Sequence, residues 1–124
     1  MTLVIGGAYQ GKLEYVMEKY PGRTLCQCDV DDPEMDLAAD IINSLHLMTL
    51  AQVRAGVDSL KYINDKLPEM KDKIIISDDI SCGVVPIDPE LRQWRETTGR
   101  SLALLSKNAD EVIRIFCGIE SKIK

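Results

Sequence analysis

The sequence predicts a single α/β domain over residues 1–124, with a mostly parallel sheet covered by helices on both faces. Strand-like apolar runs alternate along the chain with segments of helical periodicity, which is the order expected of such a sheet. The run Ile74-Ile75-Ile76 is apolar without alternation, as in a central strand that is buried on both sides. A chain of 124 residues, 45% hydrophobic and 28% charged, is large enough to bury one core.

The strands and helices are expected in a regular succession. The predicted strands are Thr2–Ile5, Arg23–Cys28, Lys73–Ser77 and Glu111–Cys117. The predicted helices are Gly11–Tyr20, Glu34–Ala55, Ser59–Met70 and Pro89–Ala109. Tyr20-Pro21-Gly22 ends the first helix, and Asp88 caps the last one, with Pro89 at its first position.

The turn after the first strand, Gly6 to Lys12, fits the pattern G-x-x-x-x-G-K and leads into a helix. In such a loop backbone N–H groups and a helix N-terminus face a phosphate, and the lysine adds a positive charge. Close packing alone also produces glycine-rich turns, but strand, glycines, lysine and helix together favour phosphate binding. The candidate phosphate-binding residues are Gly6, Gly7, Ala8, Gln10, Gly11, Lys12 and Leu13, and Lys12 is also a catalytic candidate.

Leu13 stands where the full motif has Ser or Thr, whose hydroxyl binds the nucleotide's magnesium. Asp78 and Asp79 follow the apolar third strand, so both are candidate magnesium ligands, and Asp79 could also orient an attacking hydroxyl. A solvated turn or a helix cap is the alternative for both. Ligands bind beyond the carboxyl ends of parallel strands, and the Gly6–Lys12 turn, Asp29 and these two carboxylates all fall there.

His46 is the only histidine and lies in an apolar helical pattern. It is a candidate for a nucleophile or acid–base group, whereas a packed helix residue is the more common case. Arg92, Arg95 and Arg100 recur on the last helix and could bind phosphate through their planar guanidinium groups, or form a solvated face with Glu96.

The loop from Ser81 to Pro86 could approach a ligand through its backbone or simply connect two elements. Trp94 is expected in the core or at an interface. These two alternatives stay open at the level of the sequence.

Charge and cysteine content limit the possible partners and the compartment. The net charge of −5 argues against general nucleic-acid binding, although a local phosphate site needs only a few cations. No stretch approaches the roughly 20 apolar residues that cross a bilayer, so no membrane contact is expected. Without a signal-peptide pattern we expect a cytoplasmic protein with reduced thiols at Cys26, Cys28, Cys82 and Cys117.

Two of these cysteines, Cys26 and Cys117, lie in runs predicted as buried strands. Cys26-x-Cys28 would place two thiols on one face of a strand. Because no further ligands have suitable spacing, core packing is favoured over a metal site.

The carboxyl-terminal half resembles a known family. Asp79-Ile80-Ser81-Cys82-Gly83-Val84-Val85-Pro86 is similar to E-x-G-x-G-x-V-P, and Arg92-x-Trp94-Arg95-Glu96-x-x-Gly99-Arg100 to R-x-[FW]-R-[DE]-x-x-G-R. Ala109-Asp110-Glu111-Val112, the tail Gly118-Ile119-x-x-Lys122-Ile123-Lys124 and the opening Leu3-Val4-Ile5-Gly6-Gly7-Ala8-x-x-Gly11-Lys12 agree as well. Together these segments, about half the chain, resemble the bifunctional adenosylcobinamide kinase / adenosylcobinamide-phosphate guanylyltransferase family.

The resemblance implies a P-loop NTPase-like fold, binding of ATP or GTP with Mg²⁺, and phosphorylation of a corrinoid hydroxyl. It also implies GMP transfer from GTP through a guanylylated histidine, and a homo-oligomer such as a trimer. The expected protein is therefore a nucleotide-dependent transferase. The alternative is a degenerate module that binds nucleotide or corrinoid without catalysis.

The chain departs from the family pattern at several positions. Leu13 replaces a Ser, Asp79 a Glu, Ser81 a Gly and Leu102 an Asn. The chain is also shorter between Arg23 and His46, where the family has its guanylyl-accepting histidine. Either His46 follows an acidic stretch, Asp31 to Met35, that resembles the one before that histidine, or Asn43–Met48 follows a central strand and the histidine segment is deleted. The deletion is the simpler alignment.

Overall fold

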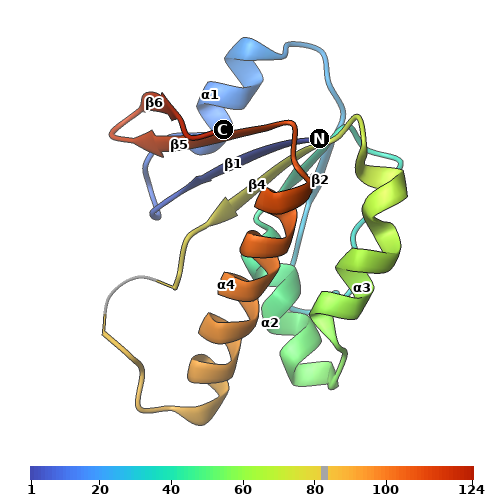
Figure 1. Ribbon diagram of the computed structural model, residues 1–124, viewed down its shortest axis with the longest axis vertical. Helices are drawn as coiled ribbons and strands as arrows, with labels where there is room; N and C mark the ends of the chain where they lie inside the picture. The colour runs from blue at the N-terminus through green and yellow to red at the C-terminus, as the bar shows by residue number, and fades with distance from the viewer. Residues whose placement is uncertain (82–83) are drawn as a thin grey trace.

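The computed structural model describes residues 1–81 and 84–124, and its centre is a six-stranded sheet in the order β2-β3-β4-β1-β5-β6 (Figure 1). The strands β1 to β5 run parallel, and β6 is antiparallel to β5. The strands are β1 (Thr2–Gly6), β2 (Leu25–Gln27), β3 (Ile41–Asn43), β4 (Ile74–Asp78), β5 (Glu111–Phe116) and β6 (Ile119–Lys122). The predicted α/β class with a mostly parallel sheet is confirmed.

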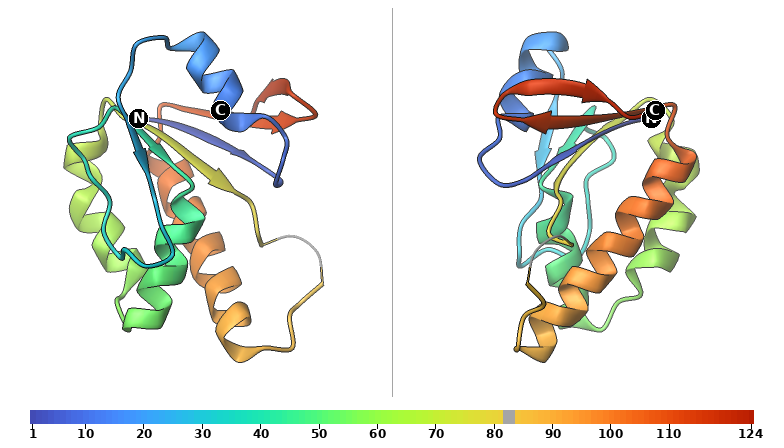
Figure 2. Two further views of the ribbon diagram at one scale, coloured as in Figure 1. Left: turned by 180° about the vertical axis from the view of Figure 1, so that it is seen from behind. Right: turned by 60° about the vertical axis from the view of Figure 1, so that its left-hand side comes forward.

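Helices cover both faces of the sheet, but unequally (Figure 2). The helical segments are α1 (Lys12–Lys19), α2 (Leu45–Ala55), α3 (Ser59–Lys66), the 3-10 helix η1 (Leu67–Met70) and α4 (Pro89–Asn108). Helix α1 packs on one face, and α2, α3 and α4 pack on the other. No helix in the described ranges is long and apolar enough to cross a membrane.

Each face of the sheet carries its own buried cluster. The cluster under α1 contains Val4, Val16, Ile41, Ile74, Ile76, Ile113 and Ile115. The larger cluster under the other helices includes Leu3, Ile42, Leu45, Met48, Ile63, Ile75, Leu102, Leu105 and Val112. Because successive strand residues point to opposite faces, β4 places Ile74 and Ile76 in one cluster and Ile75 in the other. This confirms the central, doubly buried strand predicted from the isoleucine run.

The register of the central strands brings the candidate residues to one edge of the sheet. Gly6 lies opposite Asp78 on β4, and Ile5 lies opposite Arg114 on β5. The turn after β1, the acidic residues after β4 and the end of β5 are therefore neighbours at the carboxyl edge, as the sequence predicts for parallel strands.

The predicted helix Glu34–Ala55 is wrong in its first half. Ile41–Asn43 forms β3, which pairs with β2 and β4, and Ser44, in the left-handed region at φ 61°, separates the strand from α2. Both Ile41 and Ile42 are fully buried, one on each face of the sheet. Burial between layers therefore overrode the local helical pattern.

The carboxyl-terminal strand is shorter than predicted and is followed by a hairpin that the sequence analysis missed. Strand β5 ends at Phe116, and Cys117 (φ 50°) and Gly118 (φ 75°) form the turn to β6. Cys117 is exposed there, so its prediction as a buried strand residue is wrong. Cys28 is buried and Cys26 half-buried as free thiols, while Cys82 and Gly83 lie outside the described residues.

Candidate functional site

The turn after β1 is shaped by two glycines. A Cβ on Gly6 would lie 2.5 Å from the carbonyl oxygen of Ile115, so only glycine allows β1 and β5 to approach here. Gly11 adopts the left-handed conformation (φ 84°, ψ 25°) directly before Lys12, the first residue of α1. The predicted order of a strand, a glycine-rich turn and a helix is therefore confirmed, and the N-terminus of the helix faces the turn.

The backbone of this turn has unused hydrogen-bond donors. Within the described chain, none of the N–H groups of Ala8, Tyr9 and Gly11 donates to a protein acceptor. Consecutive N–H groups of this kind, next to the positive end of a helix dipole, form an anion-binding concavity. The turn therefore has the donor set that the phosphate-binding prediction requires.

Lys12 lies below the turn and is only 8% exposed. Its Nζ donates to the carbonyl oxygen of Gly7 at 2.6 Å and pairs with Asp78 Oδ1 at 2.6 Å. The ammonium is thus held beside the turn, but part of its charge is already neutralised by Asp78.

Asp78 also contacts His46, the second residue of α2. The Asp78 backbone N–H donates to His46 Nδ1 at 3.1 Å, and His46 Nε2 lies 3.4 Å from Asp78 Oδ2. Because Nδ1 accepts a hydrogen bond, the neutral ring carries its proton on Nε2. Burial lowers the pKa of His46, while the negative charge of Asp78 acts in the opposite direction.

His46 therefore links the end of β4 to the helical layer. Its carbonyl oxygen accepts a hydrogen bond of 2.7 Å from Trp94 Nε1 on α4. Both ring nitrogens contact Asp78, which favours a positioning role over that of a free nucleophile.

Asp79 fixes the next turn of chain. Its N–H donates to the Gly6 carbonyl oxygen at 2.8 Å, and its Oδ1 accepts from the hydroxyl of Ser81 at 2.6 Å. Gly99 of α4 lies against this loop, since a Cβ there would be 3.2 Å from Ser81 Cβ. Asp79 therefore connects the glycine-rich turn with the chain that leads to α4.

Asp78 and Leu13 do not provide the carboxylate and the hydroxyl that bind magnesium in related sites. Both carboxylate oxygens of Asp78 are engaged by Lys12 and His46, and Leu13 has no hydroxyl. In residues 1–81 and 84–124 no three His, Cys, Asp or Glu side chains gather as metal ligands. Metal binding by Asp78 and Asp79 remains a prediction without structural support.

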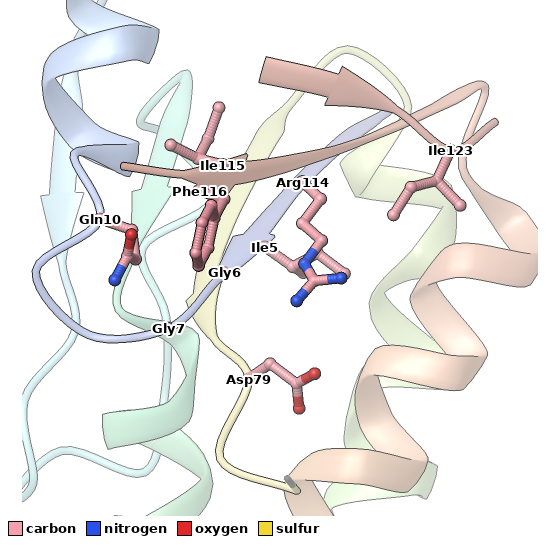
Figure 3. Close-up of a pocket in the computed structure, with 9 residues that line it drawn as sticks. All are labelled: Ile5, Gly6, Gly7, Gln10, Asp79, Arg114, Ile115, Phe116 and Ile123. Atoms are coloured by element: carbon pink, nitrogen blue, oxygen red, sulfur yellow. The ribbon is translucent and has the colours of Figure 1, made fainter. Parts of the chain in front are cut away.

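A cavity of about 390 Å³ opens beside the turn, at the carboxyl ends of β1 and β5 (Figure 3). Its lining residues are Ile5, Gly6, Gly7, Gln10, Asp79, Arg114, Ile115, Phe116 and Ile123. Arg114 and Phe116 were not among the site residues predicted from the sequence. Alternation along β5 could have indicated them, since Ile113 and Ile115 are buried under α1 while Arg114 and Phe116 are exposed.

The carboxyl-terminal hairpin holds the turn in place. Gln10 accepts two hydrogen bonds from it, one from Gly118 N–H to its carbonyl oxygen at 2.8 Å and one from Cys117 N–H to its Oε1 at 2.5 Å. The turn of the hairpin that was not predicted thus supports the site from the far end of the chain.

The predicted arginines of α4 lie together in a different groove. Arg92, Arg95 and Arg100 line it with Ser81 and Gly99, and it shares no lining residue with the cavity beside the turn. Arg95 donates to the Ser81 carbonyl oxygen at 2.6 and 3.0 Å, and Arg100 pairs with Glu96 at 2.6 Å. Their role in phosphate binding remains a prediction.

Together, the sheet and its glycine–lysine turn define an α/β domain of the P-loop NTPase-like class. Comparison with known proteins makes the assignment more specific. The sequence model of the cobinamide kinase / cobinamide phosphate guanyltransferase family matches residues 31–123, and the chain belongs to this family. This confirms the resemblance carried by the Arg92–Arg100 segment. A search of curated proteins found no match.

The family match begins after the glycine-rich turn. The assignment of Gly6–Lys12 to phosphate binding therefore depends on the geometry of the turn itself.

Proposed function

We propose that this protein, acting as one domain, binds a nucleoside triphosphate with its phosphates in the Gly6–Lys12 turn and transfers a group to a corrinoid of the cobinamide type. The observation that carries the proposal is that the N–H groups of Ala8, Tyr9 and Gly11 have no protein acceptors and lie beside Lys12 at the start of α1. Membership in a family of nucleotide-dependent transferases supports it.

In the proposed kinase reaction the acceptor hydroxyl attacks the terminal phosphorus. The bond from that phosphorus to the bridging oxygen breaks, the nucleoside diphosphate leaves, and the hydroxyl proton passes to a base. The protein contributes mainly position and charge. Lys12 and the loop amides bind the phosphates, and Asp79 is the candidate that orients the hydroxyl.

Replacing Lys12 tests the binding part of this proposal. Lys12→Ala is expected to weaken GTP or ATP binding by about tenfold or more, because it removes a charge-assisted contact. Lys19→Ala, at the opposite end of α1, is the matched control and should leave the affinity unchanged. Equal affinities for Lys12→Ala and the unmodified protein in calorimetry would remove the assignment of the turn.

A non-catalytic binding module is the second candidate, and two observations favour it: Leu13 provides no hydroxyl, and Asp78 already neutralises part of the charge of Lys12. The two candidates differ in turnover. Mass spectrometry of adenosylcobinamide incubated with ATP or GTP detects the phosphorylated product, and its absence despite nucleotide binding identifies a module.

The guanylyl transfer of the family is tested separately. GTP labelled on the α-phosphate should leave label on the protein in a denaturing gel if a guanylylated residue exists. Loss of that label in His46→Ala would assign the residue, whereas label that persists would assign another.

We further propose a homo-oligomer, with a trimer as the first possibility to test. Strand β6 is exposed along its length, and Phe116, Ile119 and Ile123 present apolar side chains at this edge. Light scattering coupled to size-exclusion chromatography measures the mass of the assembly, and a mass of 13.9 kDa would reject the proposal.

A further inference from the structure

The phosphate site described above lacks positive charge. In P-loop enzymes a metal ion bridges the β- and γ-phosphates and neutralises the charge that develops during transfer. Here Asp78 and Leu13 do not provide ligands for that ion, and the charge of Lys12 is shared with Asp78 at 2.6 Å. A bound triphosphate therefore needs another cation close to the turn.

Arg114 is placed to supply it. It lies opposite Ile5 in the register of β5 with β1, and Ile5 directly precedes Gly6, the last residue of β1. Its neighbours Ile113 and Ile115 are buried under α1, so alternation directs Arg114 to the opposite face. There its side chain lines the same cavity as Gly6, Gly7 and Gln10, with the guanidinium extending into the opening (Figure 3).

The guanidinium of Arg114 is available to a ligand. Within the described ranges it makes no ion pair or hydrogen bond with a protein group. The arginines of α4 lie in the other groove, where Arg95 and Arg100 are engaged by Ser81 and Glu96. Among the arginines of the described chain, Arg114 is thus the one that lines the cavity of the turn.

We propose that Arg114 binds the terminal phosphate of the nucleoside triphosphate held by the turn and contributes there the charge that a metal ion contributes in related sites. The planar guanidinium can donate two parallel hydrogen bonds to phosphate oxygens. This inference rests on the proposed binding of nucleotide by Gly6–Lys12, and it adds a residue that is far from that turn in sequence.

The test compares nucleotides of different phosphate number by calorimetry in EDTA, with whichever of GTP and ATP binds the unmodified protein more tightly. Arg114→Ala should weaken triphosphate binding by about tenfold or more and change monophosphate binding by less than about twofold. Arg114→Lys should retain part of the difference, because it keeps the charge and loses the planar fork. Arg23→Ala, which removes an arginine at the opposite edge of the sheet, is the matched control.

Each other outcome rejects the inference in a distinguishable way. Unchanged triphosphate affinity in Arg114→Ala excludes the contact while leaving the proposed function intact. If Arg114→Ala loses the same affinity for the monophosphate as for the triphosphate, Arg114 contacts a part of the nucleotide other than the terminal phosphate. Triphosphate binding that disappears in EDTA shows that a metal ion provides the charge. Absence of all nucleotide binding by the unmodified, folded protein rejects the proposed function together with this inference.

Discussion

Replacing Asp78 by asparagine tests the ion pair that positions Lys12. Asparagine keeps the shape of the side chain and the backbone N–H that donates to His46, but it removes the negative charge. The side chain of Lys12 is 8% exposed and that of Asp78 is 22% exposed, so the ion pair is mostly buried but keeps some contact with water. Removing one partner of a fully buried pair costs about 3–5 kcal/mol, and the exposure of Asp78 reduces this to about 2–3 kcal/mol.

The assay is denaturant unfolding followed by circular dichroism, for Asp78→Asn, Lys12→Met and the double variant. If the ion pair causes the loss, Asp78→Asn should cost at least about 1 kcal/mol less in the Lys12→Met background. The freed ammonium should also bind pyrophosphate more tightly in Asp78→Asn than in the unmodified protein. Additive losses, or a loss below about 0.5 kcal/mol for Asp78→Asn alone, would refute this account of the pair.

Three further predictions concern packing and protonation. Gly6→Ala should lower the free energy of unfolding by about 1–3 kcal/mol, because the added Cβ would lie 2.5 Å from a carbonyl oxygen of β5. Gly7→Ala is the control. Its Cβ would have its nearest contact at 3.7 Å, so it should change the free energy of unfolding by less than about 0.5 kcal/mol. Burial lowers the pKa of His46 below its ordinary 6.5, so the unfolded chain binds the proton more readily than the folded protein. The free energy of unfolding should therefore fall as the pH drops below 6.5, and it should fall less in His46→Gln. Identical pH profiles for the two proteins would contradict the lowered pKa of His46. Burial raises the pKa of the Cys28 thiol to about 12, whereas Cys117 is exposed. A thiol reagent at neutral pH should therefore modify Cys117 in the folded protein and Cys28 only after unfolding. Peptide mapping of the modified protein identifies the labelled cysteine.

The elements that could be predicted from the sequence are those in which local signals and burial agree. The isoleucine run of β4 predicted a strand buried on both faces, and the Gly6–Lys12 pattern predicted a turn between strand and helix, because both patterns depend on neighbouring residues. Helix α4 also begins where it was predicted, with Asp88 as its N-cap and Pro89 as its first residue, because capping is a local interaction.

The elements that could not be predicted are those whose conformation depends on distant segments of the chain. Ile41–Asn43 has apolar residues that suit either a helix or a strand, and only its position between β2 and β4 makes it a strand. The hairpin of β5 and β6 was missed because its turn, at Cys117 and Gly118, depends on hydrogen bonds to Gln10 from the other end of the chain.

The sequence by itself determined the class of fold, the family and the glycine-rich turn, because periodicity, turn chemistry and motif spacing are properties of short segments. Only the tertiary structure decided how Lys12, His46 and Asp78 meet, and that Arg114 shares a cavity with the turn whereas the arginines of α4 do not. The physical reason is strand order. Because β1 lies between β4 and β5, residues separated by more than sixty positions in the sequence become neighbours. Patterns within short segments of the sequence do not predict this strand order.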